Sequence, residues 1–81
     1  MLEEDPILVD SRLSQDIKVD GCLFEIKIYR LEEDTAWTLE VVDENNASHV
    51  WDDTFPAEFA ALVEAQKTIR TLGAEAFMAG H

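Results

Sequence analysis

Apolar and polar residues alternate from residue 16 to residue 31, which is the period of β-strands that bury one face. Asp20 and Gly21 interrupt the alternation, and this pair supplies the positive φ angles that a two-residue type I′ turn requires. With these two as the loop, Val19 pairs with Cys22 and the apolar side chains of both strands come to one face. The pattern predicts a β-hairpin whose core face carries Ile17, Val19, Cys22, Phe24, Ile26 and Ile28.

Two shorter strands are expected after the hairpin. The segment AWTLEVVD, residues 36–43, alternates again and places Trp37, Leu39 and Val41 on one side. The residues ENNAS tolerate the left-handed backbone of a turn, and HVW, residues 49–51, then makes a short fourth strand.

A long helix is predicted next, in a stretch rich in Ala, Glu, Gln and Lys. Asp53 or Thr54 is expected to cap it, Gly73 to end it, and Phe77 to fold back on the core. The apolar residues at helical spacing are Phe55, Phe59, Leu62, Val63, Ile69 and Leu72. The predicted core consists of Phe24, Ile26, Trp37, Leu39, Phe59, Leu62 and Ile69.

These elements predict an α+β fold with two layers, a four-stranded antiparallel β-meander with one C-terminal α-helix packed on one face. At 81 residues the chain has room for one core, so residues 16–81 are expected to form a single β-β-β-β-α domain. Residues 1–15 show no strong period and are expected to be loosely ordered, with ILV at 7–9 either a short strand or a docking tail.

The chain is strongly acidic, with 18 Asp and Glu residues against 6 Lys and Arg residues and a net charge of −12. Nucleic acids and anionic membrane surfaces are disfavoured as partners, because both bind through clustered Lys and Arg. A basic protein is the partner that this charge favours. One cysteine, no apolar span and no signal-peptide pattern lead us to expect a reduced, cytoplasmic protein.

Catalytic patterns are sparse. His49 with Asp52 or Asp53 could act as a general base with its orienting carboxylate, but aspartates just before a helix are what capping predicts. Cys22 is expected on the core face, the serines lie in no nucleophile motif, and three isolated glycines make no phosphate-binding loop. We therefore expect a non-catalytic protein without a cofactor or a metal site.

Two surfaces are candidates for binding. In a meander, the loop between the second and third strands lies at the same end of the sheet as the exit of the fourth. The carboxylates expected at that end, as a surface for a basic partner, are Glu32, Glu33, Asp34, Asp52 and Asp53. The sheet face that the helix leaves open is a possible homodimer contact through Leu23, Tyr29, Val42 and Trp51.

The order of elements is similar to that of double-stranded-RNA-binding domains and of HicB-type antitoxins. The basic cluster of the former and the proline- and glycine-containing segment of the latter have no counterpart here, so neither family carries residues over. The segments WTLEVVDE, VWDDTF and LGAEAF, in this order over about residues 17–77, resemble a group of small uncharacterised bacterial proteins. This resemblance implies a bacterial cytosolic domain and no particular activity.

The expected function is that of a protein-protein interaction module for a basic partner. An antitoxin-like or nucleic-acid-mimicking inhibitor is the alternative, and its acids should form a stripe at phosphate-like spacing. A minor enzyme or a cation-dependent protein is the third interpretation, which a pocket with converging polar groups would support.

Overall fold

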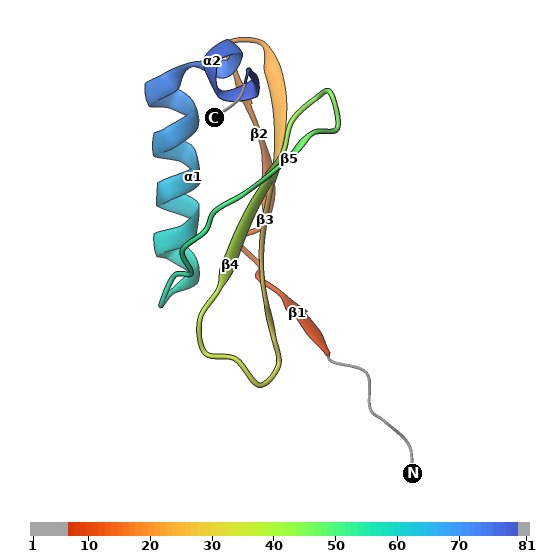
Figure 1. Cartoon of the computed structure of the whole chain (residues 1–81), viewed down its shortest axis with the longest axis vertical. Coiled ribbons are helices and arrows are strands. Elements are labelled where there is room, and N and C mark those ends of the chain that lie inside the picture. Colours follow the sequence, from red (N-terminus) through yellow and green to blue (C-terminus); the bar gives the residue numbers. More distant parts are fainter. Residues whose placement is uncertain (1–6, 80–81) are drawn as a thin grey trace.

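The computed structural model describes residues 7–79 and shows an α+β fold, in which helices cover one face of an antiparallel sheet (Figure 1). The five strands are β1 (Leu8–Asp10), β2 (Gln15–Val19), β3 (Cys22–Leu31), β4 (Thr38–Val42) and β5 (Ser48–Val50). The helices are α1 (Glu58–Leu72) and the short α2 (Ala74–Met78). Neither of these helices has the length and apolar character needed to cross a membrane.

The long strand β3 organises the sheet. It pairs with β2 and β1 along one side and with β4 along the other, and β4 in turn pairs with β5. The predicted hairpin is confirmed, because Val19 lies opposite Cys22 and the turn residues Asp20 and Gly21 have φ angles of 53° and 81°.

The sheet has five strands where the sequence favoured four. The fifth is β1, inside the segment expected to be loosely ordered, and it places Leu8 opposite Leu31. Between β1 and β2 the chain bulges, and Ser14 takes part in the ladder with its side chain: its Oγ accepts the Ile28 N–H at 3.0 Å and donates to the Ile28 carbonyl at 3.2 Å. Residues 1–6 of the expected loose segment lie outside the described residues.

The core lies between the sheet and α1. Its buried apolar residues are Val19, Phe24, Ile26, Ile28, Leu39, Val41, Ala61, Leu62, Ala65, Ile69, Ala74 and Phe77. The core prediction is confirmed for Phe24, Ile26, Leu39, Leu62 and Ile69, and Trp37 packs against this cluster while partly exposed. It is wrong for Phe59, whose side chain is 66% exposed.

The helix also starts later than predicted. Phe55 forms an isolated bridge with Trp37, with N–H to carbonyl distances of 2.9 and 2.7 Å, so residue 55 is extended along the sheet and does not begin a helix. The helix therefore begins at Glu58, after an extended Ala57 that makes no side-chain cap. The expected capping role of Asp53 or Thr54 is wrong for this reason.

The end of the helix is as expected. Gly73 has a φ angle of 87° and donates its N–H to the Ile69 carbonyl at 2.8 Å, which ends α1. The chain turns into α2, whose first N–H, that of Ala74, donates to the Asp20 carboxylate at 3.1 Å. The turn between β2 and β3 thus holds the start of α2, and α2 buries Phe77 in the core.

Candidate functional site

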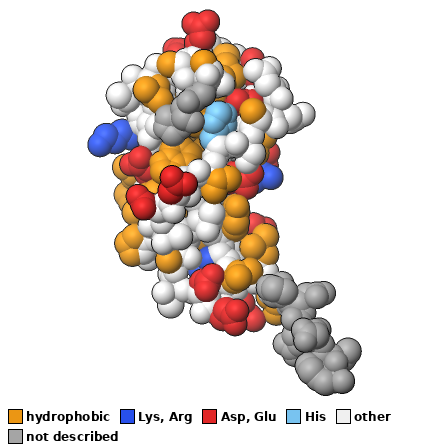
Figure 2. Space-filling model, viewed as in Figure 1, with side chains coloured by type: hydrophobic (Ala, Val, Ile, Leu, Met, Phe, Trp, Pro, Cys, Tyr) orange, Lys and Arg blue, Asp and Glu red, His pale blue; other side chains and the backbone are white. Residues whose placement is uncertain are grey.

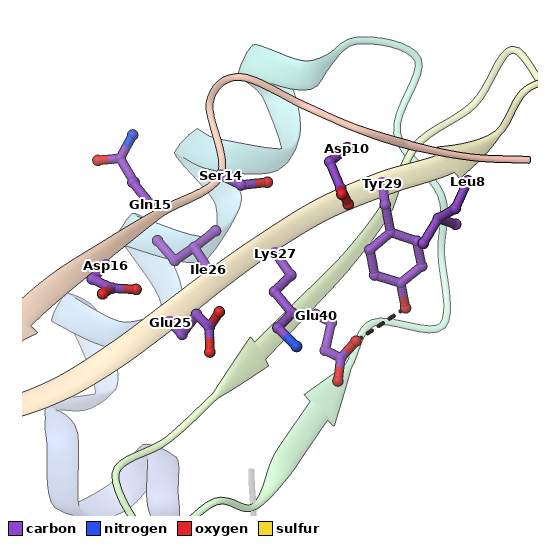
Figure 3. Close-up of a pocket in the computed structure, with 10 residues that line it drawn as sticks. All are labelled: Leu8, Asp10, Ser14, Gln15, Asp16, Glu25, Ile26, Lys27, Tyr29 and Glu40. Atoms are coloured by element: carbon purple, nitrogen blue, oxygen red, sulfur yellow. Dashed lines mark hydrogen bonds between the residues drawn. The ribbon is translucent and has the colours of Figure 1, made fainter.

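The open face of the sheet carries a hollow of about 640 Å³ where the chain bulges between β1 and β2 (Figure 3). We call it the outer-face hollow, and its lining consists of Leu8, Asp10, Ser14, Gln15, Asp16, Glu25, Ile26, Lys27, Tyr29 and Glu40. The sheet builds it directly, because antiparallel register sets Glu25 opposite Asp16 and Lys27 opposite Glu40.

The charge of the hollow is negative. Four carboxylates line it, those of Asp10, Asp16, Glu25 and Glu40, against the single ammonium of Lys27. Figure 3 shows Lys27 between Glu25 and Glu40. Among the described residues, no carboxylate lies within ion-pair distance of Lys27. The surplus carboxylates of the hollow therefore have no matching cation in the described chain.

One carboxylate of the hollow is held in place. Tyr29 donates its hydroxyl to Glu40 Oε1 at 3.1 Å, and the Ser48 hydroxyl donates to Glu40 Oε2. Partial burial, the hydrogen bond to Glu40 and the Glu40 charge together raise the pKa of Tyr29 above its ordinary value. Tyr29 is thus a neutral donor at physiological pH, and Glu40 is oriented from two sides.

The acidic turn between β3 and β4 is fastened by a cation of the preceding strand. Arg30 donates from Nη1 to the carbonyls of Leu31, Glu32 and Asp34 at 3.1, 3.0 and 2.9 Å, and its guanidinium lies 4.8 Å from the centre of the Trp37 ring. The side chains of residues 32–34 are exposed. They project from a turn whose backbone is ordered by Arg30.

Asp52 and Asp53 lie elsewhere, in a second hollow. It has a volume of about 580 Å³, runs along β5, and is lined by residues 48–53 alone; we call it the β5 hollow. Of the five carboxylates proposed for partner binding, Asp52 and Asp53 thus line the β5 hollow, and Glu32, Glu33 and Asp34 are carried by the turn between β3 and β4.

The open face carries three of the four residues proposed for a dimer contact. Leu23 is 48% exposed there, and Tyr29 and Val42 are half-buried. Trp51 is on the other face, where its ring stacks 6.1 Å from that of Phe77 and its Nε1 donates to Glu64 at 3.3 Å. Its inclusion in the dimer face is therefore wrong, since the alternation of β5 turns residue 51 toward the core.

His49 pairs with a carboxylate that sequence reasoning did not consider. Its Nε2 lies 2.9 Å from Oδ2 of Asp43, a residue only 3% exposed, and its ring lies 4.5 Å from that of Phe77. The other oxygen, Oδ1, accepts the N–H groups of Asn45 and Ala47 at 2.9 and 3.0 Å. The alternative partnership of His49 with Asp52 or Asp53 is not formed.

The environment of Asp43 favours its charged form. Burial raises the pKa of Asp43, but the hydrogen bonds from His49, Ala47 and Asn45 outweigh burial, and the pKa lies below its ordinary value. The sequence holds a signal for the burial of Asp43. Asp43 follows the buried residues Leu39 and Val41 at two-residue spacing, which places all three on the same face of the strand. In Figure 2 the pale-blue side chain, that of the one described histidine, reaches the surface beside apolar side chains.

The described residues hold no group of three or more His, Cys, Asp or Glu side chains suited to a metal ion. Cys22 is a weak candidate nucleophile, since burial and the neighbouring acids, Glu44 first, raise the pKa of its thiol. Comparison with family models, with curated proteins and with solved structures finds no match.

Proposed function

We propose that the chain is a non-catalytic interaction module that binds a basic protein partner at the outer-face hollow. The observation that carries the proposal is the concave set of four carboxylates around one lysine without an ion pair. A Lys or Arg side chain can lay its aliphatic stem on apolar surface while its charged head meets carboxylates. Leu8 and Tyr29 supply that surface, and Glu40 supplies an oriented acceptor.

The excess of acidic side chains on the surface supports the same partner. Figure 2 shows carboxylates spread over one face of the molecule and few Lys or Arg side chains. Exposed charges of one sign raise the rate at which an oppositely charged protein is met, although each contributes little to final affinity. In this proposal Glu32, Glu33 and Asp34 assist the encounter, and the outer-face hollow makes the lasting contacts.

The experiment is charge removal inside the hollow. Asp16→Asn combined with Glu25→Gln removes two carboxylates that face each other across β2 and β3, and both residues are exposed, so the fold should survive. The matched control, Glu33→Gln with Glu75→Gln, removes two exposed carboxylates outside the hollow, of which Glu33 belongs to the turn that only assists the encounter. The ligands are an octapeptide of alternating Lys and Val, measured by calorimetry at several salt concentrations, and native proteins captured from cytosol.

The hollow variant should weaken peptide binding about 2- to 30-fold, from roughly 0.2–1 kcal/mol per exposed ion pair. Its binding should also depend less on salt, because fewer ion pairs are left to screen. The control should lose less than the hollow variant in both respects. Equal losses in the two variants would mean that net charge alone acts and that the hollow is no docking site.

A further inference from the structure

The strand β5 forms an edge of the sheet, with β4 on one side and no described strand on the other. In an antiparallel pair, residues that exchange main-chain hydrogen bonds alternate with residues whose N–H and C=O groups point away. The Trp51 N–H donates to the Leu39 carbonyl at 3.1 Å, which sets the phase of this alternation. Ser48 and Val50 are therefore the residues whose main-chain groups point away from β4. No hydrogen bond among the described residues uses those groups.

The β5 hollow runs along this edge. Asp52 and Asp53 line it and are exposed, and no Lys or Arg is part of its lining. Val50 offers apolar surface, with 54% of its side chain exposed. Ser48 turns its hydroxyl to Glu40 on the open face, so this side chain does not cover the edge. Unpaired main-chain groups, apolar surface and carboxylates thus lie together along one strand.

We propose that the edge of β5 accepts an extended segment of a basic protein as an added antiparallel strand. The segment hydrogen-bonds through its main chain to Ser48 and Val50, and a Lys or Arg beside it meets Asp52 and Asp53. The proposal rests on the proposed function for the basic character of the partner. It adds a second contact surface, the edge of β5 beside the outer-face hollow's strands, and the extended conformation in which a segment of the partner binds there.

Charge selects this occupant over the other candidates. A second copy of the chain would bring its own net charge of −12 to an edge flanked by aspartates, whereas a basic segment brings opposite charge. The opposite edge of the sheet is formed by the three-residue β1 and by β2, and β2 carries the exposed Lys18. A lysine on an edge strand discourages pairing, and it repels a basic segment in particular.

The test removes one outward main-chain donor. Val50→Pro eliminates the N–H of residue 50 and leaves the hydrogen bonds between β4 and β5 in place, because proline is tolerated on edge strands where its nitrogen faces away from the sheet. Val50→Thr is the matched control, since it keeps the N–H and a β-branched side chain. The probe is the octapeptide of alternating Lys and Val, and a version N-methylated on alternate residues cannot pair as a strand.

Val50→Pro should weaken binding of the octapeptide about threefold to tenfold, the effect of one hydrogen bond, while Val50→Thr should stay within about twofold of the unmodified chain. N-methylation of the peptide should lower its affinity for the unmodified chain to a similar or larger extent. If Val50→Pro does not fold, the added strand is tested instead by amide hydrogen exchange of the unmodified protein with and without the peptide.

In that measurement the amides of Ser48 and Val50 should exchange fast in the free protein and slowly when the peptide is saturating. The amide of His49, which pairs with Val41, should change little. Unchanged exchange at Ser48 and Val50 in the saturated complex would overturn the added strand. Peptide binding that still responds to Asp16→Asn with Glu25→Gln would then leave the proposed function standing.

Two other results would overturn the proposal in different ways. Slow exchange at Ser48 and Val50 without peptide, together with a dimer in sedimentation equilibrium, would assign the edge to a second copy of the chain. Failure of the unmodified protein to bind the octapeptide even at low salt would remove the proposed function and the added strand together.

Discussion

Phe77 closes the core from the C-terminal side, and its replacement gives the sharpest test of the packing. The ring is fully buried and makes an edge-to-face contact with Phe24 at 5.6 Å between ring centres. It also lies 4.5 Å from the His49 ring and 6.1 Å from the Trp51 ring. One side chain of the short helix α2 thus touches β3 and both inward-facing residues near β5.

Phe77→Ala should destabilise the fold by about 3–5 kcal/mol through lost burial and the cavity left behind. The loss of the aromatic pair with Phe24 should add roughly 0.5–1.5 kcal/mol. A domain of 81 residues has a free energy of unfolding of about 4–12 kcal/mol, at roughly 0.05–0.15 kcal/mol per residue. The substitution therefore removes between a third and all of the stability.

The assay is urea unfolding followed by far-ultraviolet circular dichroism and by tryptophan fluorescence, in which Trp51 reports directly on the vicinity of residue 77. Phe77→Leu is the intermediate variant, because leucine keeps much of the apolar volume. Its urea midpoint should lie between that of the unmodified chain and that of Phe77→Ala. If Phe77→Ala unfolds at the same urea concentration as the unmodified chain, α2 does not close the core and the placement of Phe77 is wrong.

Two further predictions concern the exposed face of α1 and the buried acid. Phe59→Ala should change the free energy of unfolding by no more than about 0.5 kcal/mol, whereas Leu62→Ala should lower it by about 2–5 kcal/mol. Equal losses for the two variants in urea unfolding would mean that Phe59 is part of the core. Asp43 has a folded-state pKa below its ordinary value of 3.8, so its stabilising effect is complete above that value and is lost as the pH falls through the lower folded pKa. Urea unfolding measured from pH 7 to pH 2 should therefore show a shallower acid-side decline for Asp43→Asn, and an unchanged decline would contradict the role of Asp43.

The hairpin was predictable because two signals agree in it. The alternation over residues 16–31 and the pair Asp20-Gly21 each demand the same register, and the structure has it. The buried face of the helix had only one signal, the apolar spacing, and that spacing fits two faces of the helix. The true face contains the small residues Ala61 and Ala65, which are fully buried. Alanines that let a helix approach a sheet contribute little to a hydrophobic pattern. The larger Phe59 was therefore wrongly assigned to the buried face.

The concave shape of the outer-face hollow could not be predicted, for a different reason. It exists because β1 and β2 are separated by a bulge in which the hydroxyl of Ser14 bonds to the main chain of Ile28. Nothing in the segment SRLS, residues 11–14, distinguishes such a bulge from a loose terminus. Asp16, Glu25 and Glu40 lie on strands that the pattern predicts, but Asp10 and Leu8 join them only through a β1–β3 pairing that the pattern does not indicate.

The buried pair of Asp43 and His49 connects the core to the proposed edge. In β5 the residues that turn inward, such as His49, are those whose main chain bonds to β4, and the residues that turn outward present their main chain to the edge. A slip of one residue would reverse both assignments. Such a slip would remove His49 from Asp43, leaving a buried carboxylate without one of its partners, and Trp51 from Glu64. The inward contacts of His49 and Trp51 therefore determine that Ser48 and Val50 are the residues offered to a partner strand.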